Sequence, residues 1–78
     1  AGYTLTTQAL AADAYRMAEA EARIAEPGTL VVRAEAAVAT EMNKGDANVA
    51  AFANRVGRRV QVESLRDVSA DYLEVFVE

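Results

Sequence analysis

Few side chains in this sequence are of the types that commonly do chemistry. The 78 residues include no cysteine and no histidine, which removes thiol nucleophiles, disulfides, thiolate zinc ligands and the usual general base near neutral pH. Ser64 and Ser69 therefore have no histidine to activate them. We predict a non-catalytic protein that needs no cofactor.

Carboxylates are the remaining candidates for acid chemistry or metal binding. Five of the twelve carboxylates are considered for this chemistry, namely Asp13, Glu19, Glu21, Glu35 and Glu41. Acids at such spacings usually solvate a helix or form i,i+4 ion pairs, as predicted for Glu19 with Arg23. We therefore predict no metal site.

Basic residues gather at Lys44, Arg55, Arg58 and Arg59. If they converge, they would suit an acidic protein or a phosphate backbone, whereas a dispersed set balances nearby carboxylates on a solvated face. The net charge of −4 argues against general binding to nucleic acid or to an anionic membrane. We predict that the three arginines form an electrostatic surface for a protein partner.

The first half of the chain alternates strand and helix signals. Residues 2–7 alternate between apolar and Thr side chains, which predicts a short strand. Thr7 is then a predicted cap for a helix over 8–25. Its predicted core stripe consists of Leu10, Ala14, Met17 and Ile24.

Glu26-Pro27-Gly28 ends this helix, because the residue before proline avoids the α region and glycine accepts a left-handed exit. The following stretch, 29–33, is rich in β-formers and contains an apolar triplet, which predicts a central strand. A helix running from Leu30 to Met42 is the alternative, and periodicity alone does not exclude it. Otherwise residues 34–42 form a short alanine-rich helix.

A break at 43–46 precedes the second main helix, for which Asp46 or Asn48 is the predicted cap. Its apolar face ends near Val56, and Gly57 stands where a left-handed residue is expected. Residues 58–63 alternate as a strand, with Val60 and Val62 inward.

The final strand, 72–77, is predicted to form a hairpin with the strand before it, across a polar turn at 64–71. Leu73, Val75 and Val77 share one face of this strand, and Tyr72, Glu74 and Phe76 share the other. Aromatic side chains are enriched at interfaces, so we predict that Tyr72, Glu74 and Phe76 bind a partner protein. The exposed edge of this strand would also allow a homodimer.

This order of elements predicts one α/β (α+β) domain over residues 1–78, a two-layer sandwich with two main helices on one face of a four-stranded mixed sheet. No apolar run approaches the roughly 20 residues of a membrane-spanning helix, and no basic segment followed by an apolar one opens the chain. We therefore expect a cytoplasmic protein with no membrane partner.

The predicted fold resembles the TusA/SirA-type sulfur-carrier family over nearly the whole chain. The matching stretches are Thr4-Leu5, Leu10, Pro27-Gly28-Thr29-Leu30, Phe52 to Gly57 and Gly57-Arg58-Arg59-Val60. Members of that family carry persulfide sulfur on the cysteine of a Cys-Pro-x-Pro motif at the start of the first helix. The matching stretch here is Ala12-Asp13-Ala14-Tyr15, so the resemblance implies a scaffold that has lost the carrier reaction.

A second stretch resembles the KH domain, in which two short helices flank a Gly-x-x-Gly loop that clamps a nucleic-acid backbone. Asn43 and Asp46 stand where that loop has glycines, with Lys44 and Gly45 between them. An aspartate facing phosphate is electrostatically unfavourable. Our leading hypothesis is therefore an adaptor or assembly subunit that acts through protein contacts, and the alternative is a KH-like module that binds single-stranded nucleic acid.

Overall fold

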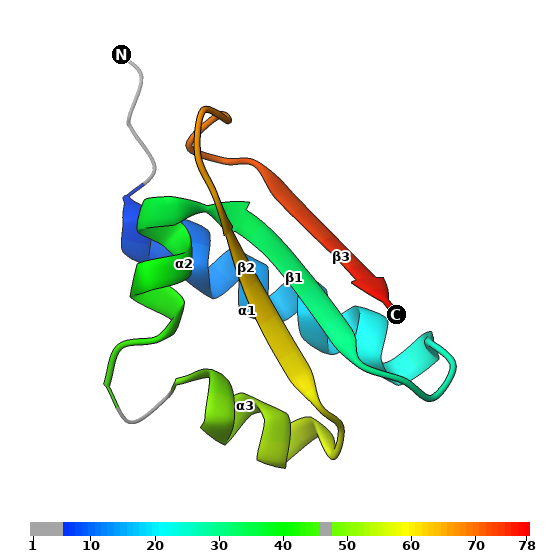
Figure 1. The fold of residues 1–78 in the computed structure, drawn as a ribbon. Coiled ribbons are helices and arrows are strands. Elements are labelled where there is room, and N and C mark those ends of the chain that lie inside the picture. The colour runs from blue at the N-terminus through cyan, green and yellow to red at the C-terminus, as the bar shows by residue number, and fades with distance from the viewer. Residues whose placement is uncertain (1–5, 46–47) are drawn as a thin grey trace.

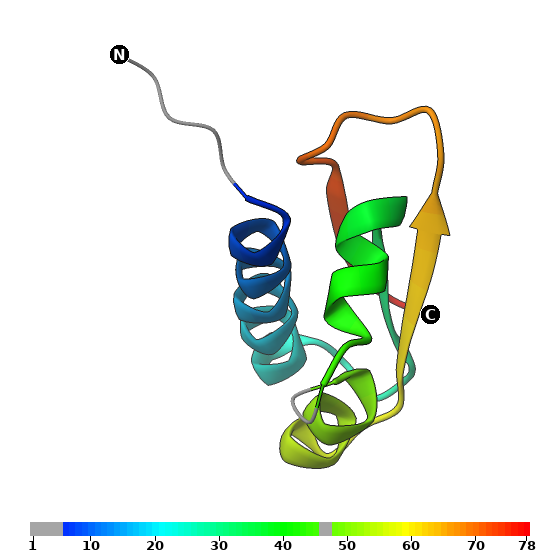
Figure 2. The same cartoon turned by 90° about the vertical axis from the view of Figure 1, so that its left-hand side faces the viewer.

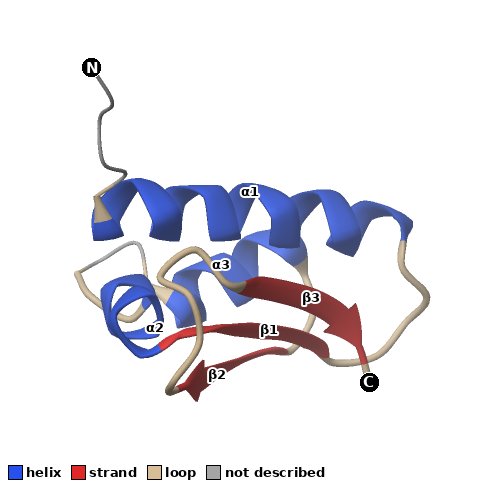
Figure 3. Cartoon of the chain, turned by 90° about the horizontal axis from the view of Figure 1, so that it is seen from above, coloured by secondary structure: helices blue, strands red, loops and turns tan. Residues whose placement is uncertain are grey.

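The computed structural model describes residues 6–45 and 48–78. These residues form an α+β fold with three helices and a three-stranded mixed sheet (Figure 1). The elements, in chain order, are α1 (Thr7–Ile24), β1 (Leu30–Glu35), α2 (Ala36–Met42), α3 (Val49–Val56), β2 (Val60–Leu65) and β3 (Leu73–Val77). Viewed from above, the three helices lie on the same side of the sheet (Figure 3).

The central strand of the sheet is β1, as predicted. It pairs in parallel with β2, in the register Leu30 to Val60, and antiparallel with β3, in the register Leu30 to Val77. Leu30, Val31 and Val32 are fully buried, because β1 has a neighbour on each edge and side chains over both faces. The alternative of one helix from Leu30 to Met42 is therefore wrong, since the helix begins only at Ala36.

The predicted hairpin of the last two strands is also wrong. β2 and β3 lie on opposite sides of β1, in the order β2-β1-β3, and do not pair with each other. The most apolar strand takes the centre, where its ladder bonds are shielded, and the connection over residues 66–72 crosses from one edge to the other (Figure 1). The predicted faces of the last strand do hold, because Leu73, Val75 and Val77 all pack against the core cluster.

The predicted first strand lies mostly outside the described residues, which begin at Thr6. Of the two described residues of this segment, Thr7 is the first residue of α1 and Thr6 is extended. The N-cap is Thr6 rather than Thr7, and its side chain accepts a hydrogen bond of 3.0 Å from the N–H of Ala9. The prediction was a four-stranded sheet with two main helices, whereas the described residues form three strands and three helices.

The face that α1 buries matches the predicted stripe only in part, because Ala14 is buried and Leu10 packs against the core cluster but the other two members do not. Ala11, Ala14 and Ala18 are the buried residues of this helix, whereas Met17 is 51% exposed and Ile24 is 81% exposed. Alanines at this spacing let the helix axis approach β1 and α2 closely, which a larger side chain would prevent. α1 lies alongside α2 (Figure 2), and the core cluster joins its alanines to Leu30, Val32, Val38, Met42 and Phe52.

The two shorter helices have local signals in the sequence. Glu35 caps α2 by accepting a hydrogen bond of 2.8 Å from the N–H of Ala37. Asn48 caps α3 by accepting one of 3.1 Å from the N–H of Ala51, as one of the two predicted caps, while Asp46 lies outside the described residues. Gly57 ends α3 in the left-handed conformation, with φ of 71°, as predicted.

The turn between α1 and β1 requires glycine at position 28. Gly28 has φ of 153°, and a Cβ there would lie 2.7 Å from Cγ1 of Val77 and 2.9 Å from the carbonyl oxygen of Glu78. The end of β3 therefore passes directly against this turn, where Thr29 and Glu78 exchange N–H···O bonds of 3.2 and 2.9 Å.

Two substitutions test which apolar residues carry the core. We expect Leu30→Ala to lower the free energy of unfolding by about 2–5 kcal/mol, because it opens a cavity at a fully buried position. Ile24→Ala should change it by less than about 0.5 kcal/mol, because that side chain is largely in solvent. Urea unfolding followed by circular dichroism measures both. Equal losses in the two variants would contradict the packing of α1 described above.

Candidate functional site

The predicted partner-binding residues of the last strand do not form one surface. Glu74 and Phe76 point to the face of the sheet opposite the helices, since they pair with Arg33 and Val31 of β1. Tyr72 precedes β3 and lines a hollow against α1 instead. The structure thus separates Tyr72 from Glu74 and Phe76.

Arg33 lies on the face of the sheet opposite the helices, next to Glu74. Its Nε donates to Glu63 Oε1 at 2.6 Å, and its Nη1 donates to Glu74 Oε1 at 3.3 Å. Its guanidinium carbon lies 4.9 Å from the centre of the Phe76 ring. The hydrogen bond with Glu63 raises the pKa of Arg33 above its ordinary value. This network ties the three strands together and occupies Glu74 and Phe76.

Tyr72 belongs to a hollow of about 360 Å³ between α1 and the segment that leads into β3. We call it the α1–β3 hollow, and it is lined by Leu10, Asp13, Met17, Val38, Ala70, Asp71, Tyr72 and Leu73. Sequence reasoning missed Met17 as a surface residue because the spacing within α1 placed it in the core. Two of the three exposed large apolar side chains among the described residues, Met17 and Tyr72, line this hollow.

The three predicted arginines reach different groups. Arg55 pairs with Glu19 of α1 at 3.4 Å, and Arg58 donates to the carbonyl oxygen of Ala25 at 3.2 Å. Arg59 is exposed, and its own carbonyl accepts the N–H of Leu30 at 2.9 Å. Arg55 therefore contacts α1, and Arg58 contacts the C-cap residue that follows this helix.

The predicted nucleic-acid loop is described only in part. Asn43 donates from its side chain to the carbonyl oxygen of Ala39 at 3.1 Å, and Lys44 pairs with Glu41 at 3.2 Å. Gly45 has φ of 71°, while Asp46 lies outside the described residues. Arg58 and Arg59 follow the far end of α3, so they do not flank this loop.

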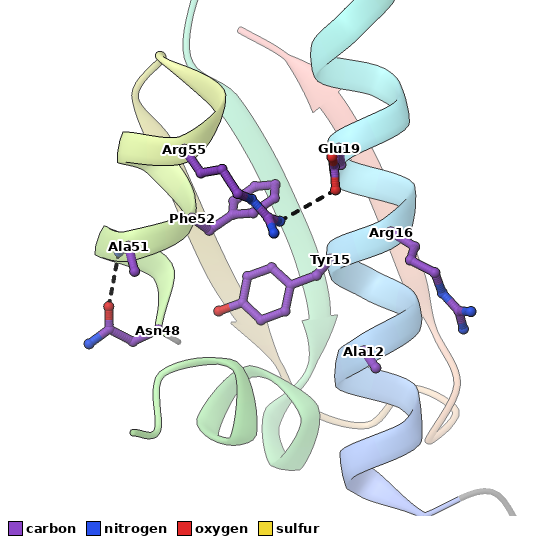
Figure 4. Close-up of a pocket in the computed structure, with 8 residues that line it drawn as sticks. All are labelled: Ala12, Tyr15, Arg16, Glu19, Asn48, Ala51, Phe52 and Arg55. Atoms are coloured by element: carbon purple, nitrogen blue, oxygen red, sulfur yellow. Dashed lines mark hydrogen bonds and ion pairs between the residues drawn. The ribbon is translucent and has the colours of Figure 1, made fainter. Parts of the chain in front are cut away.

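A second hollow, of about 380 Å³, lies between α1 and α3 (Figure 4). We call it the α1–α3 hollow, and it is lined by Ala12, Tyr15, Arg16, Glu19, Asn48, Ala51, Phe52 and Arg55. The Tyr15 and Phe52 rings lie 5.0 Å apart, tilted by 53°. The guanidinium of Arg55 lies 5.3 Å from the centre of the Phe52 ring.

The sequence held a partial signal for this hollow. Ala12, Tyr15, Arg16 and Glu19 follow helical spacing on one flank of α1, but Arg55, the partner of Glu19 on α3, is 36 residues away. Periodicity within one helix does not reveal such a pairing. The stretch Ala12 to Tyr15, which the sulfur-carrier resemblance would place at the start of a helix, lies inside α1, where Ala14 is buried and Asp13 pairs with Arg16.

No protein-family model, curated protein or solved structure matches this chain. Neither the sulfur-carrier resemblance nor the KH resemblance is therefore supported by a relative. Within the described residues no three His, Cys, Asp or Glu side chains stand together as metal ligands. No helix in that part of the chain is long and apolar enough to cross a membrane.

Tyr15 provides a pH test of the α1–α3 hollow. Its hydroxyl donates to the carbonyl oxygen of Met42, and burial raises the pKa of Tyr15 above its ordinary value of 10.0. The folded protein therefore holds this proton at a pH where the unfolded chain loses it. The contribution of neutral Tyr15 to stability is complete below the unfolded pKa and is lost as pH rises through the folded pKa.

We expect the free energy of unfolding to fall more steeply above about pH 10 in the wild type than in Tyr15→Phe. Urea unfolding at a series of alkaline pH values, with tyrosinate absorbance recorded in parallel, measures this difference. Identical slopes in the wild type and Tyr15→Phe would show that Tyr15 is as accessible in the folded state as in the unfolded chain.

Proposed function

We propose that this chain is a protein-binding domain that acts as an adaptor or as a subunit of a larger assembly and catalyses no reaction. A cytoplasmic setting and association of two copies along β3 belong to the same proposal. The absence of cysteine and histidine from the sequence supports a binding role over a catalytic one.

The observation that carries the proposal is the α1–β3 hollow. Met17 and Tyr72 are large apolar side chains held 51% and 36% exposed, and they line one concave site instead of being scattered over the surface. Apolar groups gathered in a concave site suit the anchor residue of a partner, and aromatic and Met side chains are enriched where proteins meet.

The charges at this hollow indicate the kind of partner. Asp13 and Asp71 both line it. Asp13 pairs with Arg16, and Asp71 makes no ion pair within residues 6–45 and 48–78. A partner segment with an apolar anchor next to a lysine or arginine would therefore fit both the apolar lining and the acidic groups.

A peptide-display selection against the purified chain tests this proposal. We expect enriched peptides to combine an apolar residue with a basic one. Met17→Ala with Tyr72→Ala should weaken the affinity for a synthetic copy by about tenfold or more, because the anchor loses the apolar surface that it buries. Isothermal titration calorimetry measures the loss. Asp71→Asn should weaken binding less, because an exposed ion pair contributes little.

Ile24→Ala is the matched control, because it removes an exposed apolar side chain that does not line the α1–β3 hollow. It should bind the selected peptide as the wild type does. If the selection yields only peptides whose affinity is unchanged by the double variant, the hollow is not the binding site and the proposal fails.

The edge of β3 supports the proposed homodimer. Because Thr29 and Glu78 exchange both hydrogen bonds, the antiparallel alternation directs the N–H groups of Glu74 and Phe76 to β1 and that of Val75 away from it. β3 is an edge strand in the described sheet. The outward groups of Leu73, Val75 and Val77 would pair with a second copy.

Substituting proline on this edge tests the dimer. We expect the wild type to sediment as a dimer and Val75→Pro to sediment as a monomer that still folds, because the lost N–H faces away from β1. Val62→Pro is the matched control on the edge of β2, since the ladder bond from Leu30 to Arg59 directs the N–H of Val62 outward as well. A monomeric wild type, or equal effects of both prolines, would contradict pairing through β3.

The alternative function, binding of single-stranded nucleic acid at Asn43 to Asp46, has one supporting observation. Two short helices, α2 and α3, flank this loop, as in the KH comparison. Lys44 forms an ion pair with Glu41. The arginines predicted to contact the phosphates lie in the second half of α3 and after its end, away from this loop. The α1–β3 hollow therefore supports protein binding better.

A further inference from the structure

The α1–α3 hollow is distinct from the site of the proposed function. The two hollows lie on the two flanks of the alanine stripe of α1. Leu10 and Met17 line one, Tyr15 and Glu19 line the other, and Ala14 is buried between them. A ligand of one hollow therefore leaves the other accessible.

The interior of the α1–α3 hollow is apolar. Tyr15 and Phe52 provide ring surface, and Ala12 and Ala51 are too small to fill the space between the helices (Figure 4). The hydroxyl of Tyr15 donates a hydrogen bond to the carbonyl oxygen of Met42, and Oδ1 of Asn48 accepts one from the N–H of Ala51. Since the hydroxyl proton of Tyr15 and Oδ1 of Asn48 are already hydrogen-bonded and two aromatic rings face the hollow, its interior suits an apolar or aromatic group of a ligand.

Around Glu19, on the rim, the arginines carry one positive charge more than that carboxylate balances, although Arg23 itself does not line the hollow. Glu19 is shared by two arginines, with Arg23 at 3.1 Å and Arg55 at 3.4 Å. Arg16 also lines the hollow, but its head group points away from it (Figure 4) and pairs with Asp13. Two guanidinium groups on one carboxylate leave donors unused, and the side chain of Arg55 is 62% exposed.

We propose that the α1–α3 hollow binds an acidic peptide segment in which an aromatic or large aliphatic side chain stands next to a single carboxylate. The apolar side chain packs on Tyr15 and Phe52. The carboxylate pairs with Arg55, whose guanidinium lies over the Phe52 ring and so stands directly beside the anchor.

A peptide fits this site better than a nucleic acid. One surplus charge matches one carboxylate, whereas a polyphosphate backbone gains affinity from several cationic contacts. The chain as a whole carries a charge of −4 and repels a polyanion. A single-stranded oligonucleotide is therefore the competing ligand in the test.

Amide chemical shifts of the full chain, titrated with short synthetic peptides, test the proposal. The probe is a Gly/Ser peptide containing Phe-Asp, and its two relatives carry Phe-Asn and Ala-Asp. We expect the Phe-Asp peptide to bind in the millimolar range or tighter and to shift the amides of Ala51, Phe52 and Arg55. The Phe-Asn peptide should bind about fivefold more weakly and the Ala-Asp peptide about tenfold more weakly.

Two variants with matched controls locate the site. Arg55→Gln should weaken binding of the Phe-Asp peptide about fivefold and abolish its preference over Phe-Asn, whereas Arg59→Gln, on an exposed residue outside the hollow, should not. Ala51→Leu should block binding by filling the hollow, whereas Ala50→Leu, an exposed neighbour that does not line it, should not. Circular dichroism confirms that each variant is folded.

Three results would overturn the proposal. They are equal binding of the Phe-Asp and Phe-Asn peptides, unchanged binding by Ala51→Leu, and saturable binding of an oligo(dT) probe at low salt with no binding of the Phe-Asp peptide. The variant with Met17→Ala and Tyr72→Ala should bind the Phe-Asp peptide normally. This measurement distinguishes loss of peptide binding at the α1–α3 hollow from loss of the proposed function at the α1–β3 hollow.

Discussion

A strand that is apolar on both faces must be bonded on both edges and covered on both faces, and β1 imposes this constraint on the whole chain. Leu30 and Val32 face the helices, and Val31 faces the other way, yet all three are fully buried. The helices provide one cover. The other is smaller, because Arg33 and Phe76 lie side by side over that face of the sheet. The two other strands pair with the edges of β1, and the helices cover one of its faces.

The position of α1 follows from this constraint and determines where the two hollows lie. The helix approaches β1 through alanines, so its larger side chains are displaced to the two flanks of the buried stripe. One flank holds Met17 with Asp13, and the other holds Tyr15 with Glu19 and its two arginines. A single close-packed helix thus creates two concave sites whose charges differ in sign.

Local chemistry could be predicted from the sequence, and long-range placement could not. The break at Pro27-Gly28, the cap at Asn48 and the left-handed Gly57 depend on neighbours within a few residues, and all three are found. The apolar triplet identified β1 as central. The hairpin prediction was wrong because alternation within β2 and β3 shows which face each strand buries and not which strand it pairs with. The predicted stripe of α1 was right at Leu10 and Ala14 and wrong at Met17 and Ile24, because hydrophobicity was weighted above the close approach that alanine permits.

The topology also has a consequence for how the chain folds. β1 is synthesised before both of its partners, and the residues it pairs with at Val60 and Val77 follow after two further helices and a long connection. Contacts so distant in sequence form slowly, because the intervening chain must be ordered before they add stability. Among the described elements only α1 precedes β1, so its alanine stripe is available to shelter the apolar triplet before β2 and β3 are synthesised. The edges of β1 remain open to other chains until β2 and β3 arrive, and this interval is when the protein is most prone to aggregate.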